Sequence, residues 1–376
     1  MNRLNSNSNE AFRLISHILQ KDSKNSTYKL ALLRGTIEIL SESNALVYTD
    51  NQFCYLPLAP LCEKWIYYYT PFVYHGISQN SGNKIAFYQP LKNLIDCYSG
   101  TLNDIQKGLA KDIRFGFKNG ERRNKYILCI KEIAICIIRN PMKHIAHSFY
   151  KDTYQLYLKR ANPNFSTLLK SEQQLFKNDL HNTMGYIQFK KFIQPGLELF
   201  GSFLIGEQSL IQNWATTTMN FSNNKHLSFN VEQVSQLLLQ STTIRSVEPP
   251  KGFYQELQSS SQLYCVWSGK RLTNKFDTDH IIPYSYWKNN DIWNLLPSSK
   301  SINNKKSDKI PTTERLIKQK ELILSTWKLT HTRYEQQFER EVALSLNIIN
   351  GSFEDIFNAL CQKSDYLINE LGFEGW

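Results

Sequence analysis

The sequence lacks the features that mark membrane-spanning and disulfide-stabilised proteins. Its longest apolar stretches, such as residues 127–138, are interrupted by charges, here Lys131 and Glu132, and are too short to span a bilayer. The 7 cysteines are scattered without the regular spacing of a disulfide framework, and the first residues do not resemble a signal peptide. We therefore expect a protein of the reducing cytoplasm that does not enter a membrane.

Internal repeats of solenoid period and low-complexity tracts are also missing. The 376 residues are 41% hydrophobic and 13% aromatic, which is enough apolar side chain to bury substantial cores. This length and composition exclude a disordered protein and predict two or three folded units.

One short segment near the C-terminal end combines residue types that cleave phosphodiesters. Asp279 directly precedes His280, and Asn294, Asn303 and Lys306 follow. A carboxylate and carboxamides can hold a metal ion, an imidazole can act as a general base near neutral pH, and a lysine can contact phosphate. The segment therefore predicts a metal-dependent site for phosphodiester cleavage.

The spacing of these residues is specific. From His280 to Asn294 is 14 positions, from Asn294 to Asn303 is 9, and the ending reads Asn-x-x-Lys-Ser-Asp-x-x-Pro. This pattern resembles an HNH endonuclease domain, most closely the subtype of the RNA-guided CRISPR effector nucleases. Residues 264–270 are similar to the opening strand and turn of that family, and the resemblance covers residues 262–312.

The resemblance implies a role for each residue of the motif. The implied catalytic residues are His280, Asn294 and Asn303, with His280 taking a proton from the attacking water. Asp279 and Asn303 would hold one Mg²⁺, for which Mn²⁺ can substitute, and Asn294 would steady the segment that carries His280. Oxygen ligands suit these two ions better than zinc.

The local pattern predicts two strands, at residues 263–267 and 278–282, before a loop. A helix beginning near Ser298 or Ser299 would then place Asn303 and Lys306 on one face. Two strands, a loop and a helix match the ββα-metal arrangement that the resemblance implies.

Two features of this segment have alternative interpretations. The lysines at 305, 306 and 309 are by themselves typical of a solvated helix face, but the motif favours phosphate contact for Lys306, with Lys305 as a further candidate. Cys265 could belong to a zinc clip, yet Ser268 occupies the partner position and no second pair follows. We therefore expect no structural zinc site.

Positive charge is concentrated upstream of the motif. The net charge is +11, and residues 84–160 contain 15 lysines and arginines against 6 acidic residues. The densest part, residues 114–126, interleaves basic and aromatic residues around two glycines and could follow a nucleic-acid backbone. An ordinary solvated connection between two helices is the alternative. The candidate contacts are Arg114, Lys118, Arg122, Arg123 and Lys125.

The predicted fold class is mainly α, with a small α+β ββα-metal (HNH) nuclease module near the C-terminus. Apolar periodicity predicts helices at residues 10–20, 27–40 and 125–138, and short apolar runs at residues 180–206 are compatible with strands. The predicted organisation is a mainly helical domain for substrate or partners (1–220), a polar linker (221–260), the HNH domain (261–312) and a helical segment (313–376).

A second set of metal-binding residue types is weaker. His144 and His147 lie three positions apart and Asp152 follows, but His-x-x-His without a third ligand placed in space is a common chance pattern.

Together these features predict a metal-dependent HNH endonuclease that cleaves DNA, in prokaryotic restriction or anti-phage defence. The first alternative is a nuclease subunit of a larger, RNA-guided defence complex that is inactive without its protein partners. The second alternative is a nucleic-acid-binding module that no longer cleaves, although the whole motif is present.

Overall fold

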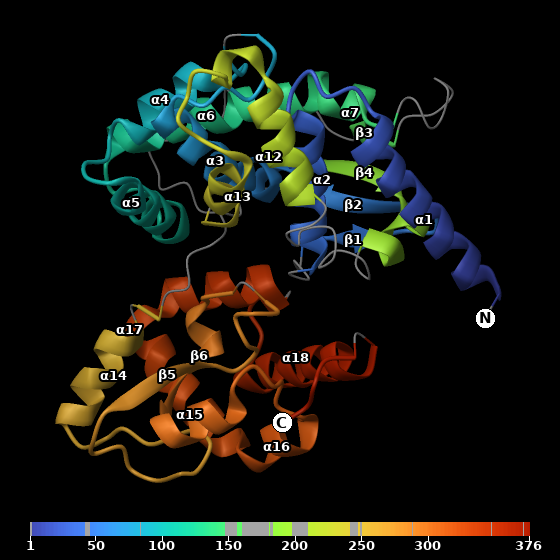
Figure 1. Cartoon of the computed structure of the whole chain (residues 1–376). Coiled ribbons are helices and arrows are strands. Elements are labelled where there is room, and N and C mark those ends of the chain that lie inside the picture. The colour runs from blue at the N-terminus through green and yellow to red at the C-terminus, as the bar shows by residue number, and fades with distance from the viewer. Residues whose placement is uncertain are drawn as a thin grey trace. The chain divides into compact units, whose positions relative to one another are not determined.

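The computed structural model divides the chain into two compact units (Figure 1). Unit 1 comprises Met1–Leu40 and Val47–Ile244, and unit 2 comprises Ser41–Leu46 and Arg245–Trp376. Both are mainly helical and each contains a small sheet. The residues that the structure describes are 2–41, 46–82, 84–146, 156–159, 180, 183–197, 210–240, 247–248, 250–287, 289–346, 348–370 and 372–376.

Unit 1 is built mainly from helices. The described ones are α1 (Asn2–Lys21), α2 (Tyr28–Ser41), α3 (Leu58–His75), α4 (Tyr88–Ile95), α5 (Leu102–Phe115), α6 (Gly120–Arg139), α7 (Pro141–His144), α12 (Leu210–Asn220) and α13 (Val231–Gln240). The helices predicted at residues 10–20, 27–40 and 125–138 correspond to α1, α2 and α6. α1 and α6 each bury one face, as their apolar periodicity indicates, whereas α2 is buried on nearly every side.

The core of unit 1 is rich in aromatic side chains from α3. Trp65 and Tyr69 are fully buried, and the Tyr69 ring lies 5.1 Å from Phe87 and 5.7 Å from Trp214 between ring centroids. Large rings contribute the most apolar area per residue, so this cluster stabilises the unit strongly. The aromatic run of α3 therefore lies in the core of unit 1.

A four-stranded antiparallel sheet completes unit 1. Its strands are β1 (Tyr48–Thr49), β2 (Phe53–Pro57), β3 (Tyr157–Lys159) and β4 (Tyr186–Lys190), in the order β1-β2-β4-β3. Only β4 lies in a region predicted to contain strands. The run from Cys54 to Tyr69 reads as one apolar segment in the sequence, but it changes from strand to helix at Pro57. Proline lacks an N–H and suits such a junction.

The predicted linker at residues 221–260 contains regular structure. It includes the short helix η2 (Ser222–Asn224), α13 and α14 (Pro250–Ser259). Val234 and Leu238 of α13 are fully buried in unit 1, and Tyr254 of α14 is fully buried in unit 2. These few apolar residues, four apart on α13, are enough to dock a helix whose overall composition is polar.

The main part of unit 2 begins with α14 and contains the HNH-like segment. Its other elements are β5 (Phe276–His280), η3 (Ile292–Asn294), β6 (Leu295–Ser299), α15 (Lys300–Lys306), α16 (Thr313–Lys318), α17 (Lys320–Leu346), α18 (Phe353–Asp365) and η4 (Tyr366–Glu370). β5 and β6 form a two-stranded antiparallel sheet. Asn350 lies between α17 and α18, and Gly372 follows η4.

Within the described ranges, every helix is either too short or too polar to cross a bilayer.

Candidate active site

β5 and β6 place the Asp279-His280 pair at the end of a hairpin. Asp279 pairs with Leu296 and His280 pairs with Leu295, so residues 281–294 form the loop that joins the two strands. The strand predicted at residues 278–282 corresponds to β5 and precedes this loop, whereas β6, which follows the loop, was not predicted. Pro297 and two serines make residues 295–299 a poor strand by composition, and the sequence predicted only a helix beginning near Ser298 or Ser299.

The strand predicted at residues 263–267 is also corrected. This run forms only an isolated bridge between Tyr264 and Arg271, around a turn in which Gly269 has φ 67°. The Val266 main-chain N–H donates to Pro297 of β6 at 3.0 Å, so the run lies along the sheet without joining a ladder. The turn reverses the chain too soon for a regular strand to form.

α15 contacts the side of β5 that carries two aspartates. Residues two apart on a strand share a face, which places Asp277 with Asp279. Asn303 Nδ2 donates to Asp277 Oδ2 at 3.0 Å, and Lys306 Nζ donates to Asp279 Oδ1 at 3.1 Å. The structure therefore brings together the predicted residues Asp279, Asn303 and Lys306. Asp277 was not predicted, although its position two residues before Asp279 was a usable signal.

Asp279 is a buried carboxylate whose two oxygens both accept hydrogen bonds. Its exposed fraction is 3%, Trp267 Nε1 donates to Oδ2 at 2.7 Å, and Lys306 supplies the bond to Oδ1. Lys306 is fully buried and also donates to the His280 main-chain carbonyl at 2.6 Å. A buried anion needs such a partner, because desolvation would otherwise cost several kcal/mol.

The environment of Lys306 corrects its predicted role. Its ammonium group is occupied inside the protein and does not reach solvent, so in this structure it cannot contact a phosphate. Lys305, the other candidate on α15, is exposed. We assign Lys306 to holding the Asp279 carboxylate in place.

The His280 side chain is oriented by the loop. It is 2% exposed, its Nε2 lies 3.3 Å from Asn290 Oδ1, and its ring centroid is 5.5 Å from that of Tyr284. A hydrogen bond to one ring nitrogen determines which tautomer is favoured. Asn290 is thus a candidate positioning residue that the sequence did not reveal.

Asn294 closes the loop behind His280. Its amide accepts from the Ile282 N–H at 2.9 Å and donates to the Ile282 carbonyl at 3.1 Å, while its own carbonyl accepts from the Ile281 N–H at 2.8 Å. Asn294 is fully buried. These bonds fix the backbone immediately after His280; the functional role of Asn294 stays a prediction.

The same loop is also held from α17, outside the motif. Trp327 Nε1 donates to the Trp293 carbonyl at 2.7 Å, and Glu341 Oε2 accepts from the Ile292 N–H at 2.6 Å. Trp327 is fully buried and Glu341 is 4% exposed. The sequence did not reveal either residue. Both lie far along the chain from the loop 281–294 that they hold, and no local pattern connects them with it.

Cys265 contacts the start of α15. Its sulfur accepts from the Ser299 N–H at 3.3 Å. Burial raises the pKa of the thiol, but hydrogen bonds from Ser268 and from main-chain N–H groups outweigh it, so the pKa lies below its ordinary value. The role of Cys265 in this structure is to anchor the turn against α15. The proposal that it holds no zinc stays a prediction.

The basic stretch lies at the junction of α5 and α6 in unit 1. Arg122 makes an ion pair with Asp112 at 3.3 Å, donates to the Cys97 carbonyl at 3.0 and 3.2 Å, and covers the Tyr98 ring at 4.3 Å. The Arg122 guanidinium is therefore paired with groups of the protein itself.

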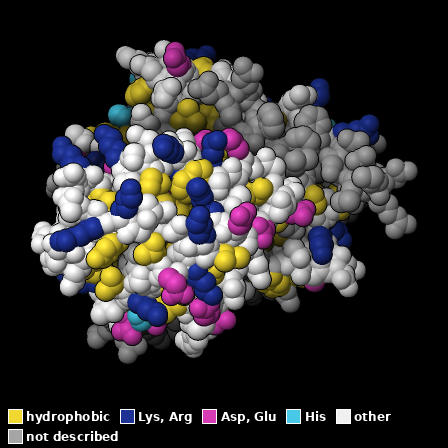
Figure 2. Space-filling view, turned by 90° about the horizontal axis from the view of Figure 1, so that it is seen from below, with side chains coloured by type: hydrophobic (Ala, Val, Ile, Leu, Met, Phe, Trp, Pro, Cys, Tyr) yellow, Lys and Arg dark blue, Asp and Glu magenta, His cyan; other side chains and the backbone are white. Residues whose placement is uncertain are grey.

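The other cations of this stretch differ in exposure. Lys125 pairs with Glu121 at 2.7 Å, Arg114 and Arg123 are partly buried, and Lys118 is exposed. Figure 2, which is seen from below the view of Figure 1, does not label this stretch; on the face that it draws, lysine and arginine side chains stand in small groups among apolar and acidic ones. Residues 116–119 connect α5 to α6, and nucleic-acid contact by this stretch stays a prediction.

Of the weaker histidine set, His144 is exposed at the end of α7. His147 and Asp152 lie outside the described residues.

Two family models match the chain in separate regions. The model described as "Domain of unknown function (DUF8808)" matches residues 8–238, and the model described as "HNH endonuclease" matches residues 265–312. No curated protein and no solved structure matches. The second match supports the HNH family and nuclease activity at the level of that family; it does not extend to the CRISPR effector subtype. The chain therefore belongs to the DUF8808 family and carries an HNH endonuclease domain.

Proposed function

We propose that the protein is a metal-dependent endonuclease that hydrolyses DNA, with its active site formed by β5, the loop 281–294 and α15. The observation that carries this proposal is the arrangement around β5. Asp277 and Asp279 share one face of β5, Asn303 of α15 bonds Asp277, and His280 follows Asp279 in the chain, within the segment that matches the HNH model. Few sites other than those for phosphodiester cleavage combine these groups.

The donor set fits a hard divalent ion. Asp277, Asp279 and Asn303 offer side-chain oxygens, with water available to complete the shell, which is the type of site that Mg²⁺ and Mn²⁺ prefer. Asp279 Oδ1 already accepts from the Lys306 ammonium, so an ion bound there would share this carboxylate with Lys306. Such an ion, when bound, offsets the charge that develops on the phosphate and the leaving oxygen.

The remaining residues prepare the general base. His280 would accept a proton from the attacking water, which requires its imidazole to be neutral. Asn290 orients the ring and Asn294 holds the backbone behind it. Lys306 links the two catalytic positions, since it bonds both the Asp279 side chain and the His280 carbonyl. The base and the metal ligand are thus fixed relative to one another.

The setting that we propose is prokaryotic restriction or anti-phage defence, with unit 1 delivering substrate or partners. A second candidate is a nuclease subunit that is inactive without a partner complex. It is favoured by the basic stretch of unit 1, in which the Arg122 and Lys125 charges are already paired within the protein. Protein partners, and not DNA, could then be what unit 1 binds.

Plasmid nicking by the purified chain with Mg²⁺ tests the proposal. We expect His280→Ala to reduce the nicking rate by about 10²- to 10⁴-fold, the usual contribution of a general base. DNA binding, measured by fluorescence anisotropy, should stay near the wild-type value. His226→Ala, an exposed histidine of unit 1, is the matched control.

Two outcomes would decide against the self-sufficient enzyme. Wild-type nicking by His280→Ala would contradict the assigned base. Silence of the wild-type chain, relieved by adding products of neighbouring genes, would favour the subunit.

A further inference from the structure

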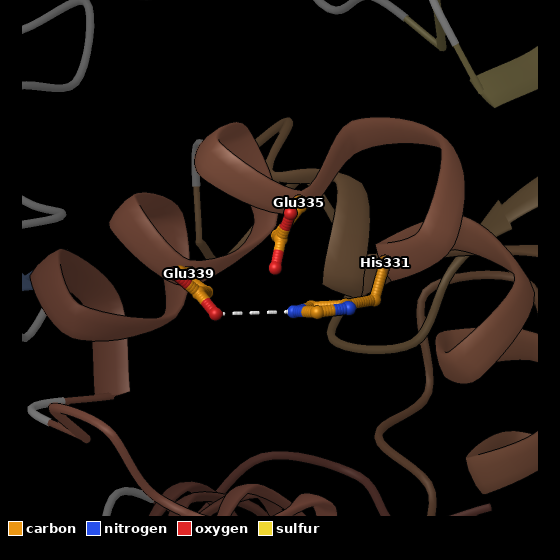
Figure 3. Close-up of side chains that lie close together, drawn as sticks. All are labelled: His331, Glu335 and Glu339. Carbon is orange, nitrogen blue, oxygen red and sulfur yellow. Dashed lines mark hydrogen bonds and ion pairs between the residues drawn. The ribbon is translucent and has the colours of Figure 1, made fainter.

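A second group of metal-binding side chains lies on α17 and shares no residue with the site on β5. His331, Glu335 and Glu339 each present one ligand atom, and these atoms all lie within 4.8 Å of one another (Figure 3). In the part of the chain that the structure describes, no other three histidine, cysteine or carboxylate side chains converge in this way. We propose that this group binds one divalent transition-metal ion.

The convergence depends on a bend in α17. Residues eight apart on a straight α-helix are separated by about 12 Å along its axis, so their side chains do not meet. Here His331 Nε2 lies 3.2 Å from Glu339 Oε1. The bend occurs at Tyr334, whose φ of −136° and ψ of 42° are not helical. Figure 3 shows the three side chains approaching one another across this bend.

His331, the least exposed of the three side chains, is held in position by aromatic contacts. Its ring meets Phe338 and Phe353 nearly edge to face, with centroids 5.6 and 5.5 Å apart and interplanar angles of 82° and 85°. Its side chain is 26% exposed, whereas that of Glu339 is 61% exposed. The imidazole is therefore preorganised, and solvent can still supply water ligands to an ion.

The chemistry of the three ligands selects the class of ion. One imidazole nitrogen with two carboxylate oxygens suits Zn²⁺ or Mn²⁺, while Mg²⁺ and Ca²⁺ prefer oxygen alone. Glu335 and Glu339 also lie four apart on a helix, where like charges repel each other. A bound cation would remove that repulsion and use all three groups.

An ion at the bend would stabilise the angle between the two halves of α17. Trp327 lies before the bend and Glu341 after it, and both bond the loop that ends at Asn294. The ion would thus act as a structural brace for this loop. This consequence rests on the proposed function, but ion binding does not.

Calorimetric titration of the EDTA-treated full chain with ZnCl₂ tests the site. We expect one saturable Zn²⁺ per chain and a rise in the thermal unfolding midpoint when zinc is present. Glu335→Gln should weaken zinc binding by about tenfold or more and abolish the zinc-dependent shift. His331→Ala should do the same.

The controls are Glu321→Gln, an exposed residue on the same helix, and His226→Ala. Both should bind zinc as the wild type does. Glu335 is exposed, so its substitution keeps the test valid even if His331→Ala disturbs folding through the lost ring contacts. Absence of a saturable site, or wild-type affinity in Glu335→Gln, would overturn the proposal. Because binding is read by heat and stability, a chain that cuts no DNA tests this inference equally well.

Discussion

At the scale of single residues, burial determines which hydrogen-bond partners the Asp279 carboxylate needs. With an exposed fraction of 3%, it depends on Trp267 and Lys306 for the hydrogen bonds that water would otherwise supply. Removing one member of a buried ion pair usually costs more than the pair contributes, because the other charge remains without compensation. Lys306 is therefore expected to matter for stability as well as for the position of Asp279.

We predict that Lys306→Met lowers the free energy of unfolding by about 3–5 kcal/mol. The double variant Asp279→Asn with Lys306→Met should recover much of this loss, because neither charge is then buried alone. Urea unfolding followed by tryptophan fluorescence measures both. Lys305→Met, at the exposed neighbouring position, should change stability by less than about 0.5 kcal/mol. Equal losses for the two lysine variants would show that the Lys306 ion pair contributes nothing measurable.

At the scale of elements, α17 supports the candidate site although it lies beyond the HNH match at residues 265–312. Trp327 and Glu341 bond the main chain of residues 292 and 293, next to Asn294. The loop that follows His280 is therefore held at its far end by a distant helix. A displacement there would move catalytic groups without touching them.

We predict that Glu341→Ala lowers kcat for DNA nicking by about 10²-fold, the scale expected of a small misplacement of reacting groups, with little change in KM. Glu341→Gln should recover most of the rate, because its amide keeps an acceptor for the Ile292 N–H. The nicking rate is measured over a range of plasmid concentrations. Glu321→Ala, exposed on the same helix, is the control. A KM effect with unchanged kcat would argue against a positioning role.

At the scale of the whole molecule, the charge is divided unequally between regions. Residues 84–160 of unit 1 carry 15 basic and 6 acidic residues, whereas residues 312–376 of unit 2 carry 7 and 10. The two hydrophobic cores share no residue, so each unit is stabilised separately. The proposed nucleic-acid contact of unit 1 can thus be tested without altering the core of unit 2.

We predict that Lys118→Glu combined with Arg123→Glu weakens DNA binding and reduces the slope of log K against log salt by about 2, since each lost phosphate contact removes about 0.9. Anisotropy titrations at several salt concentrations measure this slope. Arg122 is left unchanged because it pairs with Asp112. Lys225→Glu, another exposed lysine of unit 1, should leave the slope near the wild-type value. An unchanged slope in the double variant would leave the stretch as a solvated connection.

Local sequence patterns were sufficient for several parts of this protein. Apolar periodicity located α1, α2 and α6, because helix burial repeats over a few residues. Motif spacing gave Asp279, His280, Asn294 and Asn303 as candidates, because residue types and spacing can be read from the sequence alone; their catalytic roles stay predictions. The strands were less predictable: β6 is poor in strand-forming residues, and pairing with β5 compensates for that composition.

Long-range contacts decided the rest. The burial of Lys306 against Asp279, the hold of Trp327 and Glu341 on the loop, and the meeting of His331 with Glu339 all join residues whose separation in sequence carries no pattern. Motif spacing predicted which groups can perform the chemistry, since that depends on residue type. Their partners and surroundings depend on packing between elements and became visible only in the folded chain.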